Sequence, residues 1–149
     1  MSATPAHLAR AERPVTVAAV QMSCDWDRDA NIARADALVR EAAKQGAQVV
    51  LIPELFETPY FCIEQDVRHL RLATSLERNP AVAHFTALAR ELGVVLPVSF
   101  FEHAGQAYFN SIAIIDADAA DRRIPDAEAR VAGTEIILFL VTGPVRDVR

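Results

Sequence analysis

The sequence predicts an α/β fold in which helices pack against a sheet. Three observations indicate it: two β-branched apolar runs flank an amphipathic stretch, a second amphipathic stretch follows, and two further apolar runs surround a short polar loop. At 149 residues the chain fits one domain, and 52% hydrophobic residues supply a core. The chain has a net charge of −5 and therefore lacks the excess of basic residues that nucleic-acid binding requires, so we expect no nucleic-acid partner.

The first part of the chain is expected to form a strand, a helix and a second strand. The run VTVAAVQM (15–22) is typical of a strand buried on both faces. Apolar residues follow helical spacing over 31–44, with Asp27 and Asp29 ahead of the helix and Gly46 after it. AQVVLIP (47–53) is a second buried strand. Because this helix is long enough to cross between parallel neighbours, the segment predicts a β-α-β unit.

A second helix follows a stretch with mixed signals. Residues 54–78 show no clear period, and we expect a loop and a short helix there. Asn79 and Pro80 read as an N-cap and an N1 proline, and the apolar face that follows ends at Gly93. These start and stop signals predict a helix between them.

The next two apolar runs predict a hairpin. VVLPVSFF (94–101) and NSIAIID (110–116) are joined by a polar loop that contains glycine. Pro97 cannot donate to a sheet ladder, so the first strand should have a bulge there or lie at an edge. Beyond it, 119–133 is polar and rich in alanine and arginine, with a possible helix, and TEIILFLVTGP (134–144) reads as a last strand.

Composition also indicates the compartment. Cys24 and Cys62 are too few for a disulfide scaffold and show no metal-ligand spacing, which favours a reducing compartment. Residues 1–14 lack the apolar core of a signal peptide, and no run approaches the ~20 residues of a membrane span. We therefore expect a cytoplasmic protein with no membrane partner and with a flexible tail over 1–14. The histidines show no ligand spacing and the sequence contains no cofactor motif, so we expect neither metal nor cofactor.

Glu54 is the first candidate for chemistry, because ligands gather at the carboxyl ends of strands in α/β proteins. On position alone, an acidic residue there is more often a solvated loop residue or a helix cap than a catalytic group. Three longer segments favour a functional role: PELFETPYFC (53–62), LARELGVVLPVSFFE (88–102) and YFNSIAIIDAD (108–118). In one order and register they resemble the N-terminal half of the nitrilase superfamily of carbon-nitrogen hydrolases, and within it the N-carbamoylputrescine amidases.

The resemblance implies a nitrilase-like αββα sandwich, of which 15–149 would form an incomplete domain. Members usually form dimers or larger assemblies, need no cofactor or metal, and hydrolyse a linear ureido or amide substrate. Their site uses a cysteine nucleophile, a lysine that stabilises the oxyanion, and a glutamate that moves protons. On this resemblance Glu54 is the general base, and burial at the strand end should raise its pKa.

The resemblance also suggests substrate-binding residues. Tyr60 and Phe61 would line the substrate pocket, although ordinary aromatic packing under a loop explains them equally well. Asn110 matches the family's Asn-Ser pair near the site, where a structural hydrogen-bonding role is at least as good an interpretation. Cys62 is not expected to be the nucleophile, because the family's cysteine lies far downstream. Both cysteines are expected to be unreactive thiols in apolar surroundings.

The chain departs from the family after residue 118. No cysteine follows Cys62, and Arg122 and Arg123 stand near the place of the catalytic lysine, which a guanidinium does not replace. EARVAGTEIILFLVTGP (128–144) resembles a later part of the family sequence, so 15–118 is well matched and 119–149 is divergent or rejoined. An internal deletion explains this join, and a frameshift is the alternative.

We therefore expect no appreciable amidase activity from this chain alone. The competing interpretation is a non-catalytic, degenerate fragment that acts at most as an interaction module with an intact homologue. A half sandwich exposes a sheet face and open edges, so we expect a homo-oligomer or association through that surface.

Overall fold

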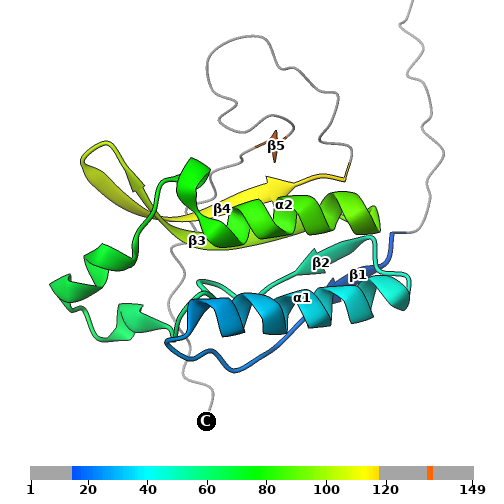
Figure 1. Cartoon of the computed structure of the whole chain (residues 1–149), viewed down its shortest axis with the longest axis horizontal. Helices are drawn as coiled ribbons and strands as arrows, with labels where there is room; N and C mark the ends of the chain where they lie inside the picture. Colours follow the sequence, from blue (N-terminus) through cyan, green and yellow to red (C-terminus); the bar gives the residue numbers. More distant parts are fainter. Residues whose placement is uncertain (1–14, 118–133, 136–149) are drawn as a thin grey trace, which may run out of the picture.

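The computed structural model describes residues 15–117 and 134–135 (Figure 1). The expected tail at 1–14, the divergent segment at 119–133 with its arginines, and all but two residues of the expected last strand lie outside the described residues. The described part mixes helices and strands, as the predicted α/β class requires.

The β-α-β unit is confirmed. Strand β1 (Val17–Ala19) pairs in parallel with β2 (Val49–Leu51), and α1 (Arg28–Lys44) connects them. The helix begins three residues earlier than predicted, because the Asp27 side chain accepts a hydrogen bond from the Ala30 backbone N–H at 3.0 Å and caps it. Asp29 therefore lies within the first turn rather than ahead of it.

The hairpin is also confirmed, with longer strands than predicted. Strand β3 (Leu96–Ala104) pairs antiparallel with β4 (Ala107–Ile115) along its whole length. The turn between them contains Gly105, whose φ of 63° is a left-handed conformation that glycine adopts without steric cost. Strand β5 (Thr134–Glu135) pairs with the end of β4.

Pro97 marks an edge, and the predicted alternative of a bulge is wrong. The β3–β4 ladder passes Pro97, opposite Ile114, without interruption. On its other side, Val95, the residue just before β3, forms a parallel bridge with Val49 of β2, in which the Val95 N–H donates to the Gln48 carbonyl at 2.8 Å. Since alternate residues donate to the same side, the missing donor of Pro97 faces β2 and ends that pairing.

Both helices cover one face of these strands. Helix α2 (Pro80–Leu92) has the predicted Asn79 cap and ends at Gly93, and it lies beside α1 in front of the sheet (Figure 1). The core lies between helices and strands and is formed by large buried apolar side chains: Phe56, Phe85, Phe100, Leu88, Leu96, Ile115, Val39, Val50 and Val98.

The opposite face of β1 and β2 is open. Side chains alternate along a strand, so Val50 enters the core while Leu51 points the other way. Leu51 is 46% exposed, and Val17 on the neighbouring strand is 65% exposed. The prediction that these two strands are buried is therefore wrong for this face, because no described element covers it.

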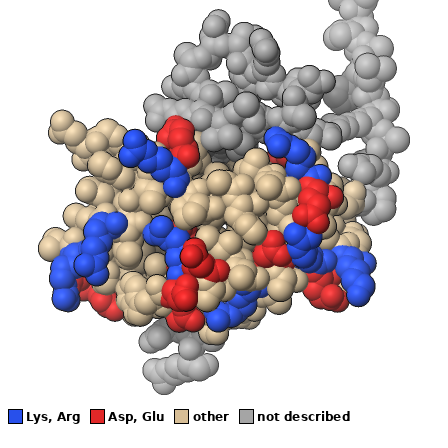
Figure 2. All heavy atoms as spheres, in the orientation of Figure 1, with Lys and Arg blue, Asp and Glu red and all other residues tan. Residues whose placement is uncertain are grey.

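The mixed stretch after β2 forms three short 3₁₀ helices, where a loop and one short helix were predicted. They are η1 (Phe61–Ile63), η2 (Val67–Leu72) and η3 (Leu76–Arg78). Figure 2 shows basic and acidic side chains interspersed on the face that carries α1 and α2. In the described part of the chain, neither α-helix has the length and apolar character of a bilayer span.

Candidate active site

Glu54 lies just beyond the carboxyl end of β2, as the sequence predicts. Its neighbours Ile52 and Leu55 enter the core, each 2% exposed, whereas Glu54 itself is exposed. The prediction of a buried Glu54 is therefore wrong for this chain, because the carboxylate lies on the solvent side of the segment. One oxygen of that carboxylate accepts a hydrogen bond from the Asn110 side-chain amide.

Asn110 joins Glu54 to the hairpin. Its Oδ1 accepts a hydrogen bond from the Ser99 hydroxyl at 3.2 Å, and the same hydroxyl accepts one from the Leu55 backbone N–H at 3.2 Å. These contacts are of the kind expected for the structural role of Asn110. Ser99, which is 5% exposed on β3, was not identified from the sequence, since a serine within a strand gives no local sign of its partners.

Tyr60 and Phe61 differ in burial and in their contacts. Phe61 is 7% exposed and packs against Phe101 and His69, with ring centroids 5.1 and 5.3 Å apart. Tyr60 is 39% exposed, and partial burial followed by the charge of Glu54 raises its pKa. The structure thus brings Tyr60 into the electrostatic field of Glu54, while the contacts of Phe61 are those of aromatic packing.

The two cysteines are free thiols in different environments. Cys24 is half-buried, whereas Cys62 is exposed, so the expectation of apolar surroundings is wrong for Cys62. Partial burial and then the charge of Glu54 raise the pKa of Cys62. Its thiolate is therefore scarce near neutral pH, which makes it a weak nucleophile despite its exposure.

Glu57, three residues after Glu54, is the centre of a buried polar network that sequence reasoning missed. Its side chain is 9% exposed and lies 3.0 Å from the Arg28 Nε, and its Oε1 accepts a hydrogen bond from the Asn79 amide at 2.7 Å. Burial raises the pKa of Glu57, while the Asn79 hydrogen bond and the Arg28 charge oppose that rise.

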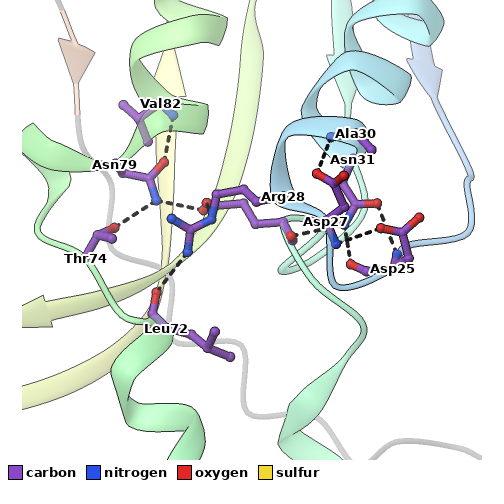
Figure 3. Close-up of polar contacts among 10 residues, drawn as sticks. Asp25, Asp27, Arg28, Ala30, Asn31, Leu72, Thr74, Asn79 and Val82 are labelled. Carbon is purple, nitrogen blue, oxygen red and sulfur yellow. Dashed lines mark hydrogen bonds and ion pairs between the residues drawn. The ribbon is translucent and has the colours of Figure 1, made fainter.

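The network ties the segment after β2 to the N-termini of both helices (Figure 3). Asn31 of α1 donates to the Glu57 carbonyl at 3.0 Å and to the Asp25 carbonyl at 2.7 Å. Asn79 caps α2 by accepting from the Val82 N–H at 2.8 Å. Because the partners of Glu57 come from distant parts of the chain, no local sequence motif predicts these contacts.

Among the described residues, no group of three or more histidine, cysteine or acidic side chains has the arrangement of a metal site. Lys44, the only lysine of the sequence, lies at the far end of α1. At ~1.5 Å per residue the helix places it roughly 24 Å from Arg28, whose side chain contacts Glu57. Lys44 therefore lies far from the Glu54–Glu57 segment, as expected.

Comparison with known proteins identifies relatives of this chain. Residues 16–125 match the family model described as carbon-nitrogen hydrolase. An N-carbamoylputrescine amidase from Arabidopsis thaliana is 50% identical over 109 residues, which cover 73% of this chain and 36% of that protein. A citrullinase from Francisella tularensis is 41% identical over 106 residues, which cover 71% of this chain and 37% of that protein. This chain thus spans little more than a third of the length of these relatives.

Solved structures show the same relationship. A carbon-nitrogen hydrolase from Helicobacter pylori G27 matches with a TM-score of 0.63 at 27% identity, over 70% of this chain and 36% of that one. Nit3 of Saccharomyces cerevisiae, a member of the nitrilase superfamily, matches in fold with a TM-score of 0.58 at 24% identity, over 70% of this chain and 40% of that one. The predicted incomplete nitrilase-like α/β fold is confirmed. The chain belongs to the carbon-nitrogen hydrolase family.

Proposed function

We propose that this chain carries the general-base portion of an amidase for linear ureido or amide substrates of the N-carbamoylputrescine type. Complete hydrolysis of such a ureido group yields an amine, CO₂ and ammonia, a reaction that would serve polyamine biosynthesis. The observation that carries the proposal is the exposed Glu54 carboxylate at the end of β2, held by Asn110 of β4. The 50% identity to the Arabidopsis amidase supports the substrate class.

Glu54 is suited to moving protons. An ionised carboxylate accepts hydrogen bonds only, and the Asn110 amide binds one of its oxygens. Within residues 15–117 the other oxygen accepts no hydrogen bond, so it is available to a substrate or nucleophile. Tyr60, exposed in the field of Glu54, is our candidate for a pocket wall, while Phe61 is buried against Phe101 and His69. Free thiols on both cysteines fit a reducing compartment, and we place this function in the cytoplasm.

This chain alone is not expected to complete the reaction. No cysteine follows Cys62, whose raised pKa disfavours the thiolate, and Lys44 lies at the far end of α1. Without a nucleophile a covalent mechanism loses several orders of magnitude in rate. Purified chain incubated with N-carbamoylputrescine should release no ammonia above the blank. Release that disappears in Glu54→Gln would contradict this part of the proposal.

A chimera tests the role of Glu54 directly. Residues 15–118 of this chain, which stop short of Arg122 and Arg123, replace the corresponding segment of the Arabidopsis relative, which supplies the rest of the protein. We expect the chimera to release ammonia from N-carbamoylputrescine and Glu54→Gln to lower the rate at least ~100-fold, the usual contribution of a positioned base.

The matched control is Glu41→Gln, which removes an exposed carboxylate from α1 whose contact is with Gln45. It should leave the rate of the chimera unchanged. A folded chimera that is active and keeps its rate in Glu54→Gln would show that Glu54 is not the base.

A second function, association with a further copy of the chain or with an intact homologue, is favoured by the open sheet face. Val17 and Leu51 are 65% and 46% exposed there, and burying such side chains favours association. The purified chain should elute as an oligomer in size-exclusion chromatography, and Leu51→Lys should shift it toward the monomer. Val67→Lys, at a 79% exposed position on η2, is the matched control. A monomeric wild-type chain would rule out self-association.

A further inference from the structure

Ser99 connects the two strands and the loop that meet at Glu54. It lies opposite Ile112 in the β3–β4 ladder, and Asn110, two residues away on β4, shares its face of the sheet. Its single hydroxyl contacts the Leu55 backbone N–H and the Asn110 Oδ1, both at 3.2 Å. Ser99 therefore contacts both the backbone that follows Glu54 and the amide that binds its carboxylate.

The direction of these hydrogen bonds is fixed by the groups involved. The Leu55 N–H can only donate, so it occupies an acceptor site of the hydroxyl. The hydroxyl proton is then available for the Asn110 Oδ1, which leaves the NH₂ group of the amide facing Glu54. A rotated amide would set its oxygen against a carboxylate that also only accepts.

The backbone at Leu55 shows that this position is constrained. Its φ of 50° is left-handed, a conformation that residues other than glycine adopt uncommonly. Leu55 is 2% exposed, and its N–H is held by Ser99. Loss of the hydroxyl would thus release the turn next to Glu54 as well as the orientation of Asn110.

We propose that Ser99 is a positioning residue for Glu54: one hydroxyl orients the Asn110 amide toward the carboxylate and holds the turn that carries it. This inference rests on the proposed function of Glu54 for its catalytic meaning. The positioning itself can be measured in the chain as it exists, without any hydrolysis.

Cys62 provides the measurement, because the charge of Glu54 contributes to its raised pKa. We would follow alkylation of Cys62 by iodoacetamide at pH 8 in the full chain by peptide mass spectrometry. Glu54→Gln should accelerate the reaction about two- to threefold, the size expected for one nearby charge in solvent. Ser99→Ala should accelerate it in the same direction, because a released carboxylate spends less time near the thiol. Ser99→Thr, which keeps the hydroxyl, should retain the wild-type rate.

The double variant separates positioning from loosening. If Ser99 acts through Glu54, Ser99→Ala adds nothing in the Glu54→Gln background. A further acceleration there would show that Ser99 merely keeps the loop closed over Cys62, and would overturn the proposal. So would a wild-type rate in a Ser99→Ala chain that keeps its circular dichroism spectrum.

Asn110→Ala is the second variant, should Ser99→Ala fail to fold. It removes the amide that binds Glu54 at a half-buried position and should give the same acceleration, again absent in the Glu54→Gln background. An unchanged rate in Asn110→Ala would overturn the proposal. If the chimera is inactive while these rates hold, the proposed hydrolase function fails and the positioning of Glu54 by Ser99 stands.

Discussion

Replacing Glu57 by alanine should strongly destabilise the fold. Breaking a fully buried ion pair costs about 3–5 kcal/mol. The Arg28 side chain is 31% exposed and can be partly rehydrated, so we take about 2 kcal/mol for its lost partner. The Asn79 amide loses its 2.7 Å hydrogen bond to Glu57 but keeps one to Thr74, which adds about 1 kcal/mol. We therefore expect Glu57→Ala to lower the free energy of unfolding by about 3 kcal/mol.

The assay is thermal and urea unfolding of the full chain at pH 7, followed by circular dichroism. For a chain of this size, about 3 kcal/mol corresponds to a fall of roughly 10 °C in Tm. Glu91→Ala is the matched control, since Glu91 also pairs with an arginine, Arg40, at 2.6 Å but in an exposed position. Exposed pairs contribute little, so this variant should unfold close to the wild type. If both variants lose the same stability, the buried network does not hold the loop.

Two further predictions concern the same elements. Burial raises the pKa of Glu57 above 4.5, so proton uptake favours the folded state: this contribution is fully present below the unfolded pKa and is lost as pH rises through the folded one. Glu57→Gln should therefore remove a decline in the free energy of unfolding that begins near pH 4.5. Parallel wild-type and variant curves in urea titrations from pH 4 to 8 would contradict this. Gly93→Ala should lower the free energy of unfolding by about 1 kcal/mol, because the left-handed C-cap at φ 69° disfavours a side chain, although nothing lies within 4 Å of the added Cβ. An unchanged urea midpoint would show that the cap does not disfavour a side chain.

Elements whose signals are local were predictable from the sequence. Both ends of α2 are predicted by residues next to them, Asn79 and Pro80 at the start and Gly93 at the end, because caps act through neighbouring backbone groups. The hairpin was identified for a similar reason, although its strands extend further than their apolar runs. For Asp27, in contrast, the sequence predicts only a place ahead of a helix that begins at residue 31, whereas the structure shows Asp27 capping a helix that begins at Arg28. Its capping hydrogen bond with Ala30 depends on the conformation of the turn before α1.

The contacts of the site were not predictable from one sequence. The position of Glu54 after β2 follows from strand order, but its exposure depends on which elements cover it. Asn110 contacts Glu54, and Ser99 contacts Asn110, because the hairpin register places both residues on one face of the sheet. The apolar pattern of the sequence does not define how that hairpin lies relative to β2. The network of Glu57 is still less local, because its side chain meets Asn79, 22 residues away.

Two carboxylates three residues apart thus have opposite environments, and this difference suggests how the segment works. Glu57 is buried and fixes the loop to the N-termini of α1 and α2, through Arg28 and Asn79. Glu54 is exposed and contacts the hairpin instead, through Asn110. Because the two sets of contacts share no side chain, the loop can be anchored without occupying the carboxylate proposed to move protons. A change at Glu57 should then act on stability first and on Glu54 only through displacement of the loop. A change at Asn110 acts on Glu54 directly, and a change at Ser99 acts on it through Asn110 and the backbone of Leu55.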